Sequence, residues 1–297
     1  MLFGKKKWFL VVVILLAGKL FALDLTIIGG AGNFSFDTSS ESAIGDGTFK
    51  GSFYPLGLIS IEDQITDTFG YTAKAQRDPV IRNVLSCEMT IDAGLLQLSV
   101  GPLFSVFNSR DTFIRPGVST SLGVEFPGIL FINFSGGATF GSSFENDYGL
   151  ETSRIALGFW LPNLLNTFSV TTSKFNEKLD SGFVQDELFR AAYRADIHAK
   201  NVPFTISIEM GYESLKRAYG SSDEDMIRAV FLGFETNITV KPHFVFILGA
   251  ETPIFVWGKD PLESAKNRLF FRAFTGFKWT LEKYQGNFVP PEFITEE

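Results

Sequence analysis

Few side chains in this 297-residue sequence are suited to catalysis. It has two histidines, His198 and His243, and one cysteine, Cys87. A catalytic base must reach a nucleophile or an activated water through a hydrogen bond. Ser207 is the one nucleophile that the residue pattern places near His198. We therefore predict that the chain is not an enzyme, keep a hydrolase as an alternative, and assign His198 to a lattice of ion pairs.

The sequence predicts neither a metal site nor a cofactor. One cysteine can form neither an internal disulfide nor a cysteine-based metal cluster. The acidic run Asp223–Asp225 lacks the glycine and the spacing of a calcium loop. The stretch "GGAGNF" at Gly29–Phe34 has the glycines of a phosphate loop, but no predicted helix follows it.

Charged residues instead recur at alternate positions along much of the chain. The positions that we select as candidates for one shared polar surface are Lys74, Glu88, Asp92, Glu125, Arg154, Asp186, Arg190, Arg194, Asp196, Glu209, Glu213, Glu235, Glu251, Arg272 and Lys278. Side chains of both signs along one wall would give a hydrated path crossed by an electric field, as in diffusion pores. The alternative is that they pair across strands and keep a narrow wall closed.

The elements that must position these residues are β-strands. In "PFTISIEMGYESLKR", Pro203–Arg217, one set of alternate positions holds Phe204, Ile206, Ile208, Met210 and Tyr212, and the other set holds mostly polar residues. We call each such set of alternate positions a parity. A period of two is typical of a strand with unlike surroundings on its two faces.

The alternation and the turn residues predict fourteen strands, with twelve as the alternative. The expected strands are 24–37, 48–62, 68–78, 82–93, 95–108, 115–127, 129–142, 148–162, 166–177, 184–199, 203–217, 225–241, 244–257 and 267–282.

The predicted connections fall into two classes that alternate along the chain. Short ones lie at Ala93–Gly94, Phe126–Gly128, Lys200–Pro203 and Lys241–His243. Longer, mostly charged ones begin at Ser39, Arg77, Asn108, Ser142, Asn176, Tyr219 and Gly258. Outer-membrane barrels sort their loops in this way, with short periplasmic turns, longer external loops and an even number of strands.

The apolar parity could face either a soluble core or lipid. About fourteen strands enclose a space too wide for side chains to fill, so either the sheet splits into a soluble sandwich or the polar parity lines a wet lumen. We predict an all-β fold, a closed antiparallel up-and-down transmembrane barrel. Aromatics near strand ends, expected in interfacial girdles, are Tyr71, Trp160, Phe168, Phe204, Tyr212, Trp257 and Trp279.

Two pairs of opposite charges are predicted across one hairpin. Strands joined near Asn201 and Val202 bring Arg190 opposite Glu213, and Arg194 opposite Glu209.

The N-terminus has the features of a secretory signal peptide. Lys5–Lys7 precede an apolar run from Trp8 to Ala17, which is too short to span a membrane, and the small residue Ala22 follows. Removing its four lysines leaves 22 basic against 33 acidic residues, a net charge of −11. The predicted organisation is a signal peptide over 1–22, a barrel over 23–283 and a periplasmic tail over 284–297.

Several stretches resemble outer-membrane barrel families of spirochaetes, treponemes in particular. They are "AQRDPVIRNVL" at Ala75–Leu85, "LSVGPLFSVFN" at Leu98–Asn108, "PGVSTSLGVEFPG" at Pro116–Gly128, "LGFWLPN" at Leu157–Asn163 and "MGYESLKRAYG" at Met210–Gly220. The length is also similar to that of monomeric fourteen-strand porins, which implies diffusion of small solutes. Most such barrels end on an aromatic residue that the assembly machinery reads, whereas this chain continues through "KYQGNFVPPEFITEE".

The expected function is that of a passive, porin-like channel for small hydrophilic solutes or ions in the cell outer membrane. A non-channel structural or surface-interaction barrel is the alternative. The expected partners are outer-membrane lipid, the barrel-assembly machinery and the solutes. Nucleic acid is not expected, because no basic cluster is present.

Overall fold

The computed structural model describes residues 22–33, 43–54, 59–68, 80–108, 112–140, 147–179, 182–198, 202–219, 223–241, 243–258 and 271–280. The predicted signal peptide, the predicted tail and Lys74 lie outside these residues, apart from Ala22, which begins the first strand. Within the described part, no helix has the length and apolar character needed to cross a membrane.

The described residues form antiparallel strands joined in chain order. The strands are β1 Ala22–Asn33, β2 Ala43–Tyr54, β3 Ile59–Thr68, β4 Val80–Asp92, β5 Leu96–Asn108, β6 Thr112–Phe126, β7 Leu130–Thr139, β8 Gly149–Leu161, β9 Leu164–Leu179, β10 Gly182–His198, β11 Phe204–Tyr219, β12 Asp223–Lys241, β13 Phe244–Gly258 and β14 Phe271–Thr280.

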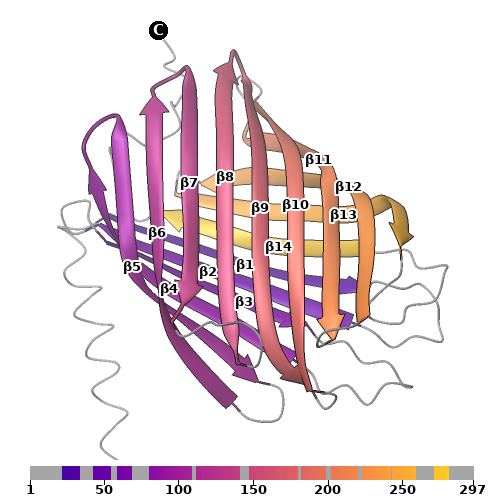
Figure 1. Ribbon diagram of the computed structural model, residues 1–297. Coiled ribbons are helices and arrows are strands. Elements are labelled where there is room, and N and C mark those ends of the chain that lie inside the picture. Colours follow the sequence, from indigo (N-terminus) through magenta and orange to yellow (C-terminus); the bar gives the residue numbers. More distant parts are fainter. Residues whose placement is uncertain are drawn as a thin grey trace, which may run out of the picture.

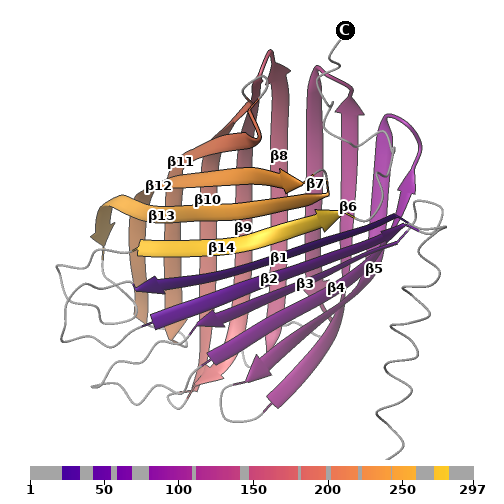
Figure 2. The ribbon, with the colours of Figure 1, turned by 180° about the vertical axis from the view of Figure 1, so that it is seen from behind.

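Each strand pairs with its neighbours in the sequence, and β1 pairs with β14 from Asp24↔Thr280 to Asn33↔Phe271, so that the sheet closes on itself. The strands β6–β10 form one wall, and β14 with β1–β4 form the opposite wall (Figures 1 and 2). The strands of the two walls run in clearly different directions, as strands tilted about a barrel axis do. The predicted antiparallel up-and-down all-β architecture is confirmed.

The second predicted strand, 48–62, is wrong in its bounds, and the third, 68–78, lies outside the described residues apart from Thr68. β2 ends at Tyr54, and β3, which starts at Ile59, pairs back onto it in antiparallel register, with Phe53 opposite Ile59. Pro55, which directly follows β2 in the sequence, has no N–H for a ladder bond.

The predicted sorting of connections holds only in part. Longer gaps between strands remain at 34–42, 69–79, 140–148 and 259–270. By contrast, β9 continues to Leu179 and β10 starts at Gly182, so most of the charged stretch predicted as a loop from Asn176 is strand. The hairpins β5–β6 and β11–β12 are extended likewise. Charged residues are compatible both with paired strands that extend into water and with loops. Composition alone therefore cannot distinguish an extended hairpin from a loop.

A small apolar cluster packs inside the sheet near the long-gap end. Leu103 on β5 and Leu150 on β8 are 3% and 2% exposed, and Val84, Tyr148 and Phe175 pack against them. Gly137 on β7 lies beside the Leu103 side chain, since an added Cβ there would come within 3.3 Å of it. The absence of a side chain at Gly137 lets Leu103 reach across the sheet.

Candidate functional site

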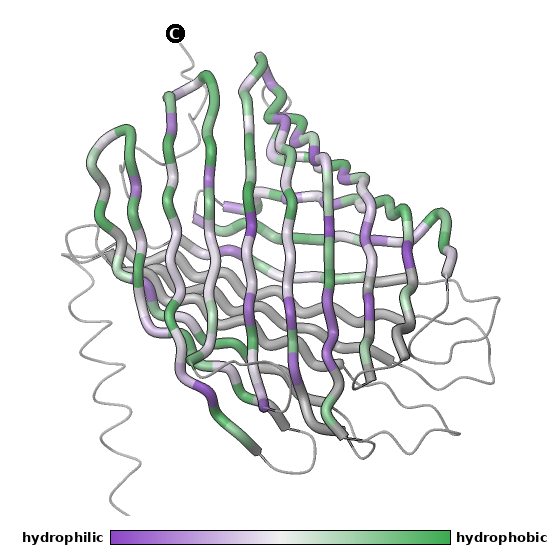
Figure 3. The backbone as a smooth tube through the Cα atoms, in the orientation of Figure 1, coloured by the Kyte–Doolittle hydropathy of each residue, from purple (hydrophilic) through white to green (hydrophobic). Residues whose placement is uncertain are grey.

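The two faces of the sheet differ in chemistry. The inner face carries buried polar side chains such as Ser105, Glu125 and Asp186, at 1%, 4% and 2% exposure. The outer face carries large exposed apolar side chains such as Ile155 and Met210, both at 51% exposure. Hydrophilic and hydrophobic residues alternate along the strands accordingly (Figure 3). This distribution is the reverse of that in a soluble protein, whose apolar side chains are inside.

The pairings place the predicted polar positions on this inner face. On β4–β9 these are Glu88, Asp92, Glu125 and Arg154, and on β10–β14 they are Asp186, Arg190, Arg194, Asp196, Glu209, Glu213, Glu235, Glu251, Arg272 and Lys278. Asp92 and Arg272 are placed by their ladder positions alone.

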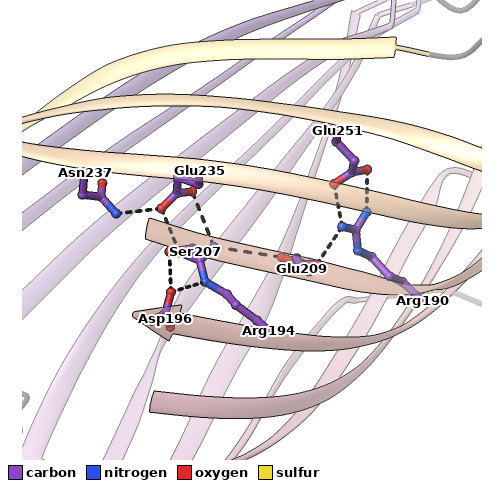
Figure 4. Close-up of polar contacts among 8 residues, drawn as sticks. All are labelled: Arg190, Arg194, Asp196, Ser207, Glu209, Glu235, Asn237 and Glu251. Atoms are coloured by element: carbon purple, nitrogen blue, oxygen red, sulfur yellow. Dashed lines mark hydrogen bonds and ion pairs between the residues drawn. The ribbon is translucent and has the colours of Figure 1, made fainter. Parts of the chain in front are cut away.

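Arg190 lies at the centre of one charged group on β10–β13 (Figure 4). Its two terminal nitrogens donate to both carboxylate oxygens of Glu251, at 3.0 and 2.7 Å. One of them also donates to Glu209 at 2.8 Å, and the other lies 3.4 Å from Glu213. A forked contact to one carboxylate fixes the plane of the guanidinium group.

Arg194 lies at the centre of a second group, next to the first. It donates through Nε to Asp196 and through a terminal nitrogen to Glu235, each at 2.8 Å. Ser207 accepts a hydrogen bond from Arg194 at 2.8 Å and donates to Asp196. Glu209, 4.0 Å from Arg194, joins this group to that of Arg190. We call the two together the charged wall: Arg190, Arg194, Asp196, Ser207, Glu209, Glu213, Glu235 and Glu251.

The predicted register of the two charge pairs is confirmed, since Arg190 lies opposite Glu213 and Arg194 opposite Glu209. The shortest ion pairs are nevertheless diagonal. Arg190 reaches Glu251, which lies three strands away on β13. Gly233 stands between Glu209 and Glu251 in the ladder and has no side chain to block this reach.

An aromatic residue that the sequence analysis missed supports Arg190. The Phe231 ring is fully buried, and the Arg190 guanidinium carbon lies 3.8 Å from its centroid. Phe231 in turn lies over Gly211, its ladder partner. The signal in the sequence is a phenylalanine on the polar parity of β12, opposite a glycine.

The charged wall contains more acid than base. Five carboxylates face two guanidinium groups, a formal excess of three negative charges. The inner face of β5–β7 is different, because its buried polar side chains are mostly hydroxyl groups, those of Ser99, Ser105, Ser119 and Thr139, with Glu125 as the exception. One side of the enclosed space is therefore acidic and another is lined by hydroxyl groups.

The candidate serine and histidine are not brought together. Ser207 lies opposite Asp196, whereas His198 lies opposite Thr205 and its Nδ1 is 3.1 Å from the Thr205 hydroxyl. The other histidine, His243, is exposed at the turn between β12 and β13. In the described part of the chain, no group of three or more His, Cys, Asp and Glu side chains is arranged to hold a metal ion.

Outer-face aromatics gather in two groups. Phe159, Phe168 and Tyr193 lie toward the short turns, with ring centroids 6.4 and 4.9 Å apart. Phe189, Tyr212 and Trp257 lie toward the other end, with centroids 6.1 and 5.9 Å apart. Trp160, expected in such a girdle, lies instead on the inner face, where it packs edge-on against Phe131.

Neither a protein-family model nor a curated protein matches the sequence. Among solved structures, an outer-membrane channel from Pseudomonas putida F1 is 7% identical and has a TM-score of 0.50, over 88% of this chain and 95% of that one.

Two further structures are less similar. A bacterial polysaccharide outer membrane secretin is 12% identical, with a TM-score of 0.47, over 86% of this chain and 98% of that one. The TodX monoaromatic hydrocarbon channel is 8% identical, with a TM-score of 0.45, over 89% and 90%. At these identities only the fold is comparable, and the first match shows it to be that of an outer-membrane β-barrel.

Proposed function

We propose that this protein is a fourteen-stranded barrel of the outer membrane whose lumen conducts small hydrophilic solutes or ions and favours cations. The observation that carries the proposal is the inverted polarity of the sheet. An apolar outer face can contact lipid, and a charged inner face can hold water.

The acidic excess of the charged wall supports the preference for cations. A lumen with net negative charge lowers the free energy of a passing cation and raises that of an anion. The two arginines of the wall remain partly accessible to water, with side chains 26% and 31% exposed, whereas Ser207 and Asp196 are buried. Ion pairs exposed to this degree contribute little to folding, on the order of 0.2–1 kcal/mol each, so we assign them mainly to the field in the lumen.

Conductance across a planar lipid bilayer tests the proposal. In a salt gradient the refolded protein should give discrete openings with a cation-selective reversal potential. Arg190→Ala with Arg194→Ala should increase that selectivity, because two positive charges are removed. Glu235→Gln with Glu251→Gln should decrease it.

Arg228 provides the matched control, because this arginine occupies an outer-face position of β12, opposite Ser214. Arg228→Ala should leave the reversal potential unchanged. A folded barrel without openings would support the structural-barrel alternative. If both double variants open but keep the parent's reversal potential, the charged wall does not line the conducting path.

A further inference from the structure

The outer face bears a groove of about 740 Å³ that runs across β6–β12. This volume is within the range of small-molecule sites, roughly 300–1,000 Å³. Most of its lining comes from outer-face positions, so it opens away from the lumen. Two rows of its residues cross the strands, and a row of apolar residues borders them.

The floor of the groove is a row of small residues in successive ladder positions: Thr120, Gly136, Ser153 and Thr172. Ser153 and Thr172 are exposed, and their hydroxyl oxygens are 2.7 Å apart. A floor of this kind offers hydrogen bonds at the bottom of a depression.

One rim is charged, with signs that alternate from strand to strand. Glu151, Lys174, Glu187 and Lys216 are consecutive ladder partners on β8–β11. Lys174 lies 3.5 Å from Glu187, and their side chains are 34% and 44% exposed. The row carries no net charge, and its neighbours stand about 5 Å apart, the spacing of adjacent strands.

On its other side, the second rim, the groove is bordered by apolar residues that lie just outside its lining. Ile155 and Val170 follow Ser153 and Thr172 toward the short turns, and are 51% and 41% exposed. From Leu164 to Thr172 the strand β9 advances eight steps, about 26 Å along the strand. A tilt of roughly 40° makes this about 20 Å along the membrane normal, most of the roughly 25 Å apolar band of membrane barrels. The groove therefore lies where that band meets water, beside the aromatic group of Phe189 and Tyr212.

The geometry points to a binding site for the headgroup of a zwitterionic phospholipid, of the phosphatidylethanolamine type. The lysines would receive the phosphate and the glutamates the ammonium, which the two-carbon linker places a few ångströms away. The floor hydroxyls would donate to phosphate or ester oxygens, and an acyl chain would follow Ile155 and Val170. This inference rests on the proposed membrane location, but not on conduction.

Native mass spectrometry of the purified full-length protein, titrated with lipids of identical acyl chains, tests the site. Phosphatidylethanolamine should be retained about tenfold more than phosphatidylglycerol or diacylglycerol, as expected from a few modest charge contacts. Lys174→Ser with Lys216→Ser should abolish that preference. Ser153→Trp should also lower retention, because it fills the groove and leaves both rims unchanged.

The matched controls lie outside the groove. Lys241→Ser removes an exposed lysine at the end of β12, and Thr236→Trp adds an indole to the outer face of the same strand; both should retain the lipid as the parent does. Equal retention of the three lipids, stronger retention of phosphatidylglycerol, or an unaffected Ser153→Trp variant would overturn the site.

A crosslinked dimer through Ser153→Cys in a Cys87→Ala background would also overturn the site, since a second copy would then cover the groove. Each preparation is first tested for a lower gel mobility after heating, and its conductance is recorded. A loss of either property would count against the proposed function, independently of lipid retention.

Discussion

Gly211 shows how one residue without a side chain shapes the inner wall. The Phe231 ring comes within 2.8 Å of the place that a Cβ at Gly211 would take, and the Arg190 guanidinium carbon lies 3.8 Å from the ring centroid. Phe131 over Gly158 and Phe274 over Gly249 repeat the arrangement. An aromatic ring that covers a glycine on the next strand is a known way of stabilising a sheet. Here it also keeps three large side chains out of the enclosed space.

Gly211→Ala tests this arrangement. The new Cβ would collide with the Ala191 carbonyl oxygen and lie 2.8 Å from the Phe231 ring. We expect the barrel to lose about 1–3 kcal/mol of stability, as in overpacked cores. Urea unfolding in lipid vesicles, followed by tryptophan fluorescence, measures the loss.

Gly233→Ala is the matched control, because its added Cβ would come no closer than 3.4 Å to the Glu209 side chain. It should unfold at nearly the parent concentration of urea. Equal destabilisation by both substitutions would mean that the ring contact at Gly211 has no special weight.

At the scale of single residues, the sequence predicted which residues lie opposite each other on neighbouring strands better than it predicted which side chains touch. The opposition of Arg190 to Glu213 follows from parity and turn position alone, and it is confirmed. The forked pair with Glu251 was not predictable, because it depends on the reach of the arginine side chain and on the gap at Gly233. The same register places Ser207 opposite Asp196, but the hydrogen bond between them depends on the conformations of the two side chains.

At the scale of the strands, alternation located most elements to within a few residues. It failed where a proline interrupted an otherwise regular run, at Pro55, and where charged strands were read as loops, as in β9 and β10. The alternation of polar and apolar residues predicts which face of the sheet a residue occupies. Polar composition alone does not predict the residue at which a strand ends. The resemblance to spirochaete barrels stays a prediction.

The orientation of the hairpins can be tested by cysteine labelling in a Cys87→Ala background. A cysteine at Ser221, between β11 and β12, should react with an impermeant maleimide on intact cells. A cysteine at Val202, in the short turn before β11, should react only after permeabilisation. The opposite result would invert the barrel in the membrane.

At the scale of the whole molecule, the inner face is divided into distinct regions. Leu103 and Leu150 form an apolar cluster near the long-gap end, hydroxyl groups line β5–β7, and the charged wall occupies β10–β13. We expect permeating solutes to follow the charged wall, because water and ions avoid apolar constrictions. No pattern in the sequence predicted this division of the inner face, because it depends on which strands face one another across the barrel.

The diagonal reach of Arg190 also has a mechanical consequence. Its ion pairs connect β10 and β11 to β13, and so tie the hairpin β10–β11 to the hairpin β12–β13. When the barrel is pulled from a membrane by one end, these four strands should leave together, in one long extension event. In the Arg190→Ala, Arg194→Ala variant the event should split into two shorter ones, each the length of one hairpin. Single-molecule force spectroscopy reads these lengths directly, and an unsplit event in the variant would show that the ladder alone holds the four strands together under load.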